Sequence, residues 1–127
     1  MRLIIGGAFQ GKTKFTQEYL KLNNGMIDGN DCSTEEIFTC KVINHFHEYI
    51  RRALERGEEC NDLADELIKR NPDCVIIVDE LGCGVVPTEP FERLLRERSG
   101  RVCTELAEYA TDVYRVVSGI GQVIKGA

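Results

Sequence analysis

Residues 3–13 read Leu-Ile-Ile-Gly-Gly-Ala-Phe-Gln-Gly-Lys-Thr, a short apolar run that breaks into glycines and ends in a lysine and a threonine. From Gly6 onward this run matches G-x-x-x-x-G-K-[ST], the phosphate-binding loop or P-loop. The apolar run predicts a buried strand before the loop, and a helix is expected after it, which is the context that the motif requires. The residues predicted to bind a nucleotide are Gly6, Gly7, Ala8, Phe9, Gln10, Gly11, Lys12 and Thr13.

Each part of this loop has a physical role in binding phosphate. Glycines let the backbone turn tightly, so that several N–H groups face one anion, and a following helix adds its positive dipole end. In such loops the lysine, here Lys12, contacts the β- and γ-phosphates, and the hydroxyl of Thr13 is a ligand for Mg²⁺. The expected ligand is therefore ATP or GTP together with Mg²⁺.

The composition is that of an ordinary globular protein. At 127 residues the chain is expected to form a single P-loop nucleotide-binding domain over residues 1–127. Its formal net charge of -5 gives no electrostatic support for a nucleic-acid partner or an anionic membrane. No apolar run is long enough for a membrane span, and the P-loop begins too early for a signal peptide, so the expected location is the cytoplasm.

Cysteine spacing points away from metal and redox chemistry. None of the six cysteines forms a C-x-x-C pair, and several stand where a small buried apolar residue would fit. We therefore interpret them as reduced structural thiols.

Two carboxylates follow the most apolar strand of the chain. Residues 74–80 read Cys-Val-Ile-Ile-Val-Asp-Glu, which is typical of a parallel strand buried on both faces with its C-terminal end at a ligand-binding edge. P-loop proteins hold Mg²⁺ through a carboxylate at this place. Because successive strand residues point to opposite faces, only one of the two is expected to face the phosphates. We assign Asp79 to Mg²⁺ and Glu80 to the substrate or to general-base catalysis.

The remaining patterns predict strands that alternate with helices. Strands are expected at residues 2–5, 25–29, 74–80 and 112–118. Helices are expected at residues 12–22, 33–56 and 61–71, with a fourth that begins near Pro90 and is divided at Gly100. The second of these helices opens with a capping box, Ser33 answered by Glu36. This alternation predicts an α/β class and a P-loop NTPase-like three-layer fold with a mostly parallel central sheet.

Both histidines of the chain fall within the predicted helix 33–56. His47 lies on its apolar stripe and is expected to be partly buried, which favours a structural role. His45 is two positions away, on a different face, and is expected to be more exposed, which permits a nucleophilic role.

Taken together, these residues resemble the adenosylcobinamide kinase / adenosylcobinamide-phosphate guanylyltransferase family of cobalamin biosynthesis. The family's loop G-G-A-R-S-G-K-S corresponds to residues 6–13, and its N-E-V-G-x-G-I-V-P corresponds to residues 79–87, Asp-Glu-Leu-Gly-Cys-Gly-Val-Val-Pro. Its R-x-F-R-D-x-x-G and A-D-x-V-y-x-V-x-x-G correspond to residues 93–100 and 110–119. The family strand that reads D-C-L-T-L-W has no counterpart in this chain, and Asp79 replaces an asparagine of the family.

The resemblance implies transfer of a γ-phosphate from ATP or GTP to adenosylcobinamide, followed by transfer of GMP through a histidine. The family's guanylylated histidine stands in R-I-x-x-H, which corresponds loosely to residues 41–45 and makes His45 the candidate nucleophile. The resemblance also implies a homo-oligomer. Two other functions are consistent with the same residues: a small P-loop kinase or NTPase with a different acceptor, and a non-catalytic nucleotide-binding regulatory module.

Overall fold

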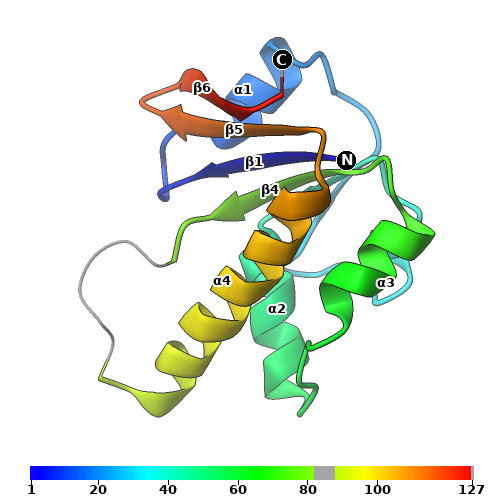
Figure 1. The fold of residues 1–127 in the computed structure, drawn as a ribbon, viewed down its shortest axis with the longest axis vertical. Coiled ribbons are helices and arrows are strands. Elements are labelled where there is room, and N and C mark those ends of the chain that lie inside the picture. Colours follow the sequence, from blue (N-terminus) through cyan, green and yellow to red (C-terminus); the bar gives the residue numbers. More distant parts are fainter. Residues whose placement is uncertain (82–87, 127) are drawn as a thin grey trace.

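A computed structural model describes residues 1–81 and 88–126 of the chain, and shows a central sheet with helices on both sides (Figure 1). The predicted class, α/β with three layers and a mostly parallel sheet, is confirmed. Along the chain the elements are β1 (Arg2–Gly6), α1 (Lys12–Glu18), β2 (Met26–Asp28), the 3₁₀-helix η1 (Glu36–Phe38), β3 (Val42–Asn44), α2 (Phe46–Glu55), α3 (Leu63–Arg70), β4 (Val75–Asp79), α4 (Pro90–Tyr109), β5 (Asp112–Val117) and β6 (Ile120–Lys125).

The sheet has the strand order β2-β3-β4-β1-β5-β6. Every neighbouring pair from β2 to β5 is parallel, and only β6 runs antiparallel, against β5. The first five strands therefore end at one edge of the sheet, where ligands bind in open α/β folds. In register, the last residue of β1, Gly6, is opposite Asp79 of β4, and Asp28 of β2 is opposite Asn44 of β3.

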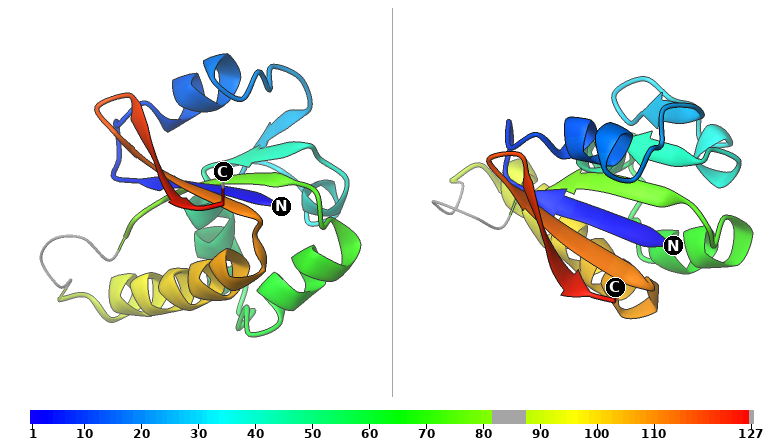
Figure 2. Two further views of the ribbon diagram at one scale, coloured as in Figure 1. Left: turned by 45° about the horizontal axis from the view of Figure 1, so that its top comes forward. Right: turned by 90° about the horizontal axis from the view of Figure 1, so that it is seen from above.

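Two hydrophobic clusters separate the layers, because side chains alternate between the faces of a strand. Leu3 of β1 and Ile76 of β4 pack on the face covered by α2, α3 and α4. Their neighbours Ile4 and Ile77 pack on the opposite face, beneath α1. Figure 2 shows this arrangement from two sides, with α1 alone above the sheet and the other helices below it. Both strands are buried on two sides, as their apolar sequences predict.

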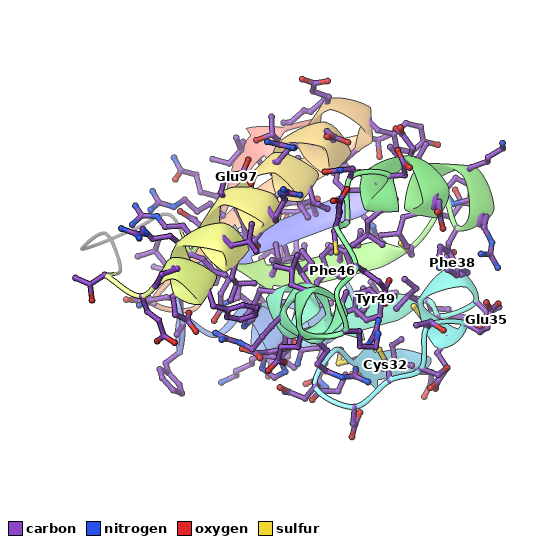
Figure 3. All side chains as sticks on the ribbon, turned by 90° about the horizontal axis from the view of Figure 1, so that it is seen from below. Cys32, Glu35, Phe38, Phe46, Tyr49 and Glu97 are labelled. Atoms are coloured by element: carbon purple, nitrogen blue, oxygen red, sulfur yellow. The ribbon has the colours of Figure 1, made fainter. Side chains whose placement is uncertain are left out.

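The predicted helix 33–56 is wrong, because three separate elements occupy this segment. The capping box forms, with the Ser33 N–H donating to Glu36 Oε1 at 2.8 Å and the Glu36 N–H donating to Ser33 Oγ at 3.2 Å. It begins only the single turn η1, and β3 and α2 follow. Apolar residues at helical spacing therefore belong to different elements that bury the same core. Figure 3 shows Phe46 and Tyr49 of α2 on this side, with Cys32 near them.

Three other boundaries differ from the predictions. Helix α1 is shorter than expected and ends at Glu18. Helix α4 continues through Gly100 without interruption, because Leu95, Val102 and Leu106 on its buried face pack into the core on both sides of the glycine. The C-terminal tail forms strand β6, joined to β5 by Ser118 and Gly119. Both joining residues have positive φ, as a two-residue hairpin turn requires.

The described cysteines are free thiols, which agrees with the structural role predicted for them; Cys83 lies outside the described residues. Burial raises the pKa of Cys40 to about 11 and that of Cys74 to about 12. Among residues 1–81 and 88–126, no helix is both long enough and apolar enough to span a bilayer.

Candidate functional site

Residues 7–11 of the predicted phosphate loop connect β1 to α1 at the edge of the sheet where the parallel strands end. Gly11 is the N-cap of α1 with φ of 85°, a left-handed conformation that glycine adopts without steric cost. The loop forms one wall of a hollow with a volume of about 420 Å³. The residues that line it are Ala8, Phe9, Gln10, Gly11, Lys12, Thr13, Lys14, Asn44, His45 and Asp79. The structure thus brings the loop together with the predicted nucleophile and the predicted metal ligand.

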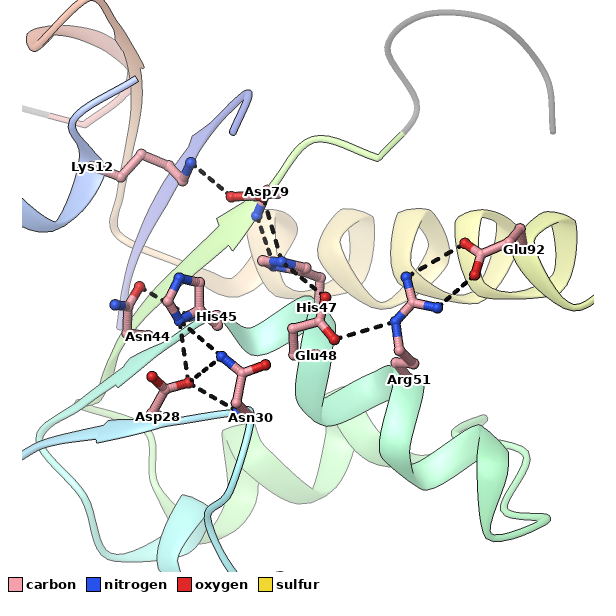
Figure 4. A network of polar contacts seen from close by, with 10 residues as sticks. All are labelled: Lys12, Asp28, Asn30, Asn44, His45, His47, Glu48, Arg51, Asp79 and Glu92. Atoms are coloured by element: carbon pink, nitrogen blue, oxygen red, sulfur yellow. Dashed lines mark hydrogen bonds and ion pairs between the residues drawn. The ribbon is translucent and has the colours of Figure 1, made fainter. Parts of the chain in front are cut away.

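Lys12 and Asp79, which both line this hollow, form an ion pair (Figure 4). Lys12 Nζ lies 2.7 Å from Asp79 Oδ1 and also donates a hydrogen bond to the Gly7 carbonyl at 2.6 Å. The two side chains are only 8% and 18% exposed, respectively. The pair is formed because Gly6 and Asp79 are opposite each other at the ends of adjacent parallel strands. Each charge therefore neutralises the other in a partly desolvated place.

The residues present fit an Mg²⁺ ion that is shared with a bound nucleotide. Thr13 and Asp79 line the same hollow and supply a hydroxyl and a carboxylate oxygen, which are hard ligands of the kind that Mg²⁺ prefers. Among the described residues, no group of three or more His, Cys, Asp or Glu could hold a metal. The protein ligands are therefore few, which is usual where substrate phosphates and water complete the coordination of Mg²⁺.

His45 is held by a carboxylate from the neighbouring strand. Its Nδ1 lies 3.1 Å from Asp28 Oδ1, and because a carboxylate can only accept, Nδ1 carries the shared proton (Figure 4). The side chain of Asn30 donates to the same oxygen at 2.9 Å. Partial desolvation acts to raise the pKa of Asp28, but the hydrogen bonds from Asn30 and His45 lower it below its usual value. With Nδ1 engaged in this way, Nε2 of the neutral ring carries the free lone pair.

Local structure explains why His45 stands at this place. The residue follows β3 directly and is the N-cap of α2, with φ of 53°. The prediction that His45 lies inside a helix is therefore wrong, because the residue stands between a strand and a helix. Gly29, which follows β2, packs directly against His45. A Cβ at Gly29 would be 2.1 Å from the His45 carbonyl oxygen. Arg52 of α2 fixes the turn after β2 by donating to the carbonyls of Gly29 and Cys32 at 2.9 and 2.8 Å.

His47 lies beneath Asp79 and is buried, as its place on the apolar stripe predicts. The Asp79 backbone N–H donates to His47 Nδ1 at 3.2 Å, so the proton of the neutral ring is on Nε2. Nε2 faces Asp79 Oδ2 at 3.4 Å and Glu48 Oε1 at 3.6 Å. Burial lowers the pKa of His47, although the two nearby carboxylates favour its protonated form. The imidazole thus supports both the backbone and the carboxylate of Asp79.

Glu80 is placed apart from the hollow that contains the other candidate residues. Its Oε1 accepts a hydrogen bond from Arg115 Nε of β5 at 3.0 Å, whereas Asp79 points toward Lys12. The opposite directions of the two side chains agree with the alternation expected of a strand. The catalytic role of Glu80 stays a prediction. The glycine-rich segment that follows, residues 82–87, lies outside the described residues.

Sequence reasoning did not assign roles to two residues of this site. Asp28 falls within the predicted strand 25–29 and has no assigned role, because its pairing with His45 depends on the unpredicted strand β3. His47 was interpreted as structural, and its contacts with Asp79 depend on the packing of α2 against β4. A signal was present in both cases, a polar residue directly after or near a strand end, but the sequence does not show which strand ends are neighbours.

Comparison with known proteins identifies the family. The family model described as cobinamide kinase / cobinamide phosphate guanyltransferase matches residues 29–124, which include His45, Asp79 and Glu80. The chain belongs to this family. The resemblance stated from the sequence is thereby confirmed. The kinase/guanyltransferase match begins after the phosphate loop, so the assignment of residues 6–13 rests on their own motif and geometry.

Two relatives in this family carry the name bifunctional adenosylcobalamin biosynthesis protein CobU, one from Escherichia coli (strain K12) and one from Salmonella typhimurium. Each is 45% identical to this chain over 51 residues. The aligned stretch is 40% of this chain and 28% of each relative. The match therefore spans less than a third of the length of these relatives.

Proposed function

We propose that this chain is a nucleotide-dependent phosphoryl and nucleotidyl transferase of the adenosylcobinamide kinase / adenosylcobinamide-phosphate guanylyltransferase type. The observation that carries the proposal is the single hollow in which Lys12, Asp79 and His45 meet. A phosphate-binding cation and a metal-binding carboxylate serve both reactions, and an oriented imidazole is the nucleophile that guanylyl transfer needs in addition. Family membership and the names of the two relatives support the substrate class.

In the kinase step, the loop holds ATP or GTP with Lys12 on the β- and γ-phosphates and Thr13 and Asp79 on Mg²⁺. Bound Mg²⁺ neutralises the negative charge of these phosphates. A hydroxyl of adenosylcobinamide attacks the γ-phosphorus, the bond to the bridging oxygen breaks, and the nucleoside diphosphate leaves. The proton of the hydroxyl passes to a base, for which Glu80 is the candidate. Catalysis comes mainly from positioning and charge neutralisation.

In the guanylyl-transfer step, His45 Nε2 attacks the α-phosphorus of GTP and pyrophosphate leaves. The product is a phosphoramidate in which GMP is bound to His45. Asp28 holds Nδ1 and stabilises the positive charge that develops on the ring, as the carboxylate of a catalytic triad does. A phosphate oxygen of the kinase product then attacks the same phosphorus, and His45 is released in its starting form.

Protein labelling tests the guanylyl-transfer step. Incubation with Mg²⁺ and α-labelled GTP, followed by denaturation, should leave acid-labile label on the wild-type chain and none on His45→Ala. γ-labelled GTP should leave no label, which separates guanylylation from phosphorylation. Asp28→Asn retains a hydrogen-bonding group but not the charge, and should slow labelling by about 10- to 100-fold, the usual effect of removing a carboxylate that orients a functional histidine. Absence of label on the wild-type chain would rule out this step.

Phosphorylation of adenosylcobinamide by γ-labelled ATP or GTP tests the kinase step separately. We expect His45→Ala to retain this activity and Glu80→Gln to lose most of it. Nucleotide hydrolysis without a phosphorylated cobinamide would favour a small P-loop kinase or NTPase with a different acceptor. Nucleotide binding with neither activity would favour a regulatory module, which agrees with the short stretch shared with the relatives.

We further propose that the chain acts in the cytoplasm as one nucleotide-binding domain and assembles with copies of itself. The hairpin of β5 and β6 supports self-association, because Val117 and Ile124 are 48% and 54% exposed. Light scattering after size exclusion would measure the mass of the particle. A mass equal to that of one chain would contradict the assembly.

A further inference from the structure

A second groove lies between α1 and the hairpin of β5 and β6. It is larger than the hollow of about 420 Å³ lined by residues 8–14, which we call the phosphate hollow. The volume of the groove is about 650 Å³, within the range of small-molecule sites. Gly11 and Lys14 line both this groove and the phosphate hollow, so the two adjoin at these residues. In Figure 2, α1 and the hairpin lie next to each other at this side of the sheet.

The hairpin is attached to the phosphate loop through Gln10. Its side-chain Oε1 accepts a hydrogen bond from the Ser118 N–H at 2.7 Å, and its carbonyl accepts one from the Gly119 N–H at 2.7 Å. These bonds join the turn of the hairpin to the loop directly. A molecule with its phosphates on the loop would therefore have its remaining part next to a wall of fixed position.

Aromatic rings form the floor of the groove. Phe15 and Tyr19 of α1 stack with ring centroids 5.0 Å apart, and the ring of Tyr114 packs against Phe15 at 5.5 Å. Tyr19 is 67% exposed although it belongs to this cluster. Exposed aromatic faces of this kind bind planar rings, because every nucleobase has a π-face on which it can stack.

Glu18 supplies the polar group that distinguishes one base from another. It lines the groove, and within residues 1–81 and 88–126 its carboxylate makes no hydrogen bond or ion pair. The Watson–Crick edge of guanine presents two neighbouring N–H donors, at N1 and N2, which match the two acceptor oxygens of a carboxylate. Adenine presents a donor beside an acceptor, N6 and N1, and the acceptor would be repelled by the second oxygen.

We propose that this groove holds the base of the nucleotide whose phosphates bind the P-loop, and that Glu18 makes guanine the preferred base. The ribose then lies over Gly11 and Lys14, where the two hollows meet. The inference rests on the proposed function, and it deepens that proposal by assigning the base-reading residue and the nucleotide class.

Calorimetric titration with GTP, ITP and ATP in the presence of Mg²⁺ tests the proposal, on a His45→Ala background that cannot take up GMP. With the groove unchanged, this protein should bind GTP about 10- to 100-fold more tightly than ATP, the usual range for a charge-assisted pair of hydrogen bonds. ITP lacks the N2 amino group and should bind with intermediate affinity. Glu18→Gln should reduce the GTP-to-ATP ratio at least tenfold, whereas Glu55→Gln, an exposed control on α2 with the same charge change, should leave it unchanged.

Two further measurements separate this inference from the proposed function. Tripolyphosphate has no base, so its binding should depend on Lys12 and be unaffected by Glu18→Gln or Tyr19→Ala. Tyr19→Ala should weaken GTP and ATP alike, because stacking does not discriminate between purines. If GTP binds but Glu18→Gln and Tyr19→Ala leave its affinity unchanged, the groove assignment is wrong and the phosphate site stands. If neither GTP nor tripolyphosphate binds, both proposals are wrong.

Discussion

The ion pair between Lys12 and Asp79 makes a quantitative prediction about stability in the absence of nucleotide. The two charges are 2.7 Å apart, and their side chains are 8% and 18% exposed. Removing Lys12 leaves the Asp79 carboxylate in a partly buried place beside the His47 ring, whose Nε2 lies 3.4 Å away. Removing the Asp79 charge leaves the Lys12 ammonium with the Gly7 carbonyl. Each single variant is left with one unpaired charge. The stability lost by the two single variants together should therefore exceed the stability lost by the double variant.

Coulomb's law sets the scale of this effect. At 2.7 Å and an effective dielectric constant of about 20, the gross attraction is about 6 kcal/mol. Desolvation of both charges offsets much of it, as it does for other buried pairs. We expect Lys12→Met and Asp79→Asn each to lower the free energy of unfolding by about 1–3 kcal/mol. The coupling energy should be about 1–3 kcal/mol, so that the double variant loses less than the sum.

Urea denaturation at neutral pH without nucleotide measures all four corners of the double-mutant cycle. A second cycle at Glu97 and Arg101 is the matched control, because this ion pair joins successive turns of α4 and both side chains are about half exposed. Its coupling should be below about 0.5 kcal/mol. A coupling at Lys12 and Asp79 no larger than that of the control would show that this ion pair does not stabilise the fold.

Nucleotide binding gives the same cycle a second readout. Asp79 repels a triphosphate without metal and attracts one that carries Mg²⁺. Asp79→Asn should therefore bind GTP more tightly than wild type when Mg²⁺ is chelated, and more weakly when Mg²⁺ is present. An equal change of affinity in both conditions would contradict the assignment of Asp79 to the metal.

Three other predictions follow from local contacts. Gly29→Ala should lower the free energy of unfolding by about 1–3 kcal/mol, because the new Cβ would clash with the His45 carbonyl. Gly100→Ala should raise it by up to about 1 kcal/mol, because Gly100 is an exposed position inside α4 with free space for a Cβ. Because the fold lowers the pKa of His47, the unfolded chain binds a proton on this histidine more readily than the folded chain, and stability falls as pH drops from 7 to 5. Urea denaturation should therefore show a smaller loss of stability over that range for His47→Gln than for wild type. Cys74, with a pKa of about 12, should stay unmodified by iodoacetamide at pH 8 until the chain unfolds, as peptide mass mapping would detect.

The elements that could be predicted are those whose own residues are enough to identify them. Residues 3–13 contain a strand, a loop motif and a helix start in sequence, and β4 is recognisable because four consecutive β-branched residues end in a carboxylate. Both predictions are confirmed as elements of structure. Neither depends on knowing what packs against it.

The predictions fail where the burial of one core is divided among short elements. Val42 and Ile43 of β3 are fully buried against β4, yet together with Ile50 they also satisfy a helical spacing. A three-residue strand carries too few positions for its period to be distinguished from that of a helix. The error had a functional consequence, since it placed His45 within a helix rather than at a strand end.

The placement of the candidate site follows from that strand end. Asp28, His45, Asp79 and Gly6 come at or directly after the ends of β2, β3, β4 and β1, which are consecutive neighbours in the sheet. Parallel strands bring these ends to one edge, so residues as far apart in the sequence as Ala8 and Asp79 line one hollow. Different strands position the residues of the two proposed reactions. The position of Asp79 depends on β1 and β4, whereas the position of His45 depends on β2 and β3. A change at Asp28 should therefore impair transfer through His45 while nucleotide binding at Lys12 persists, and a change at Lys12 should impair both.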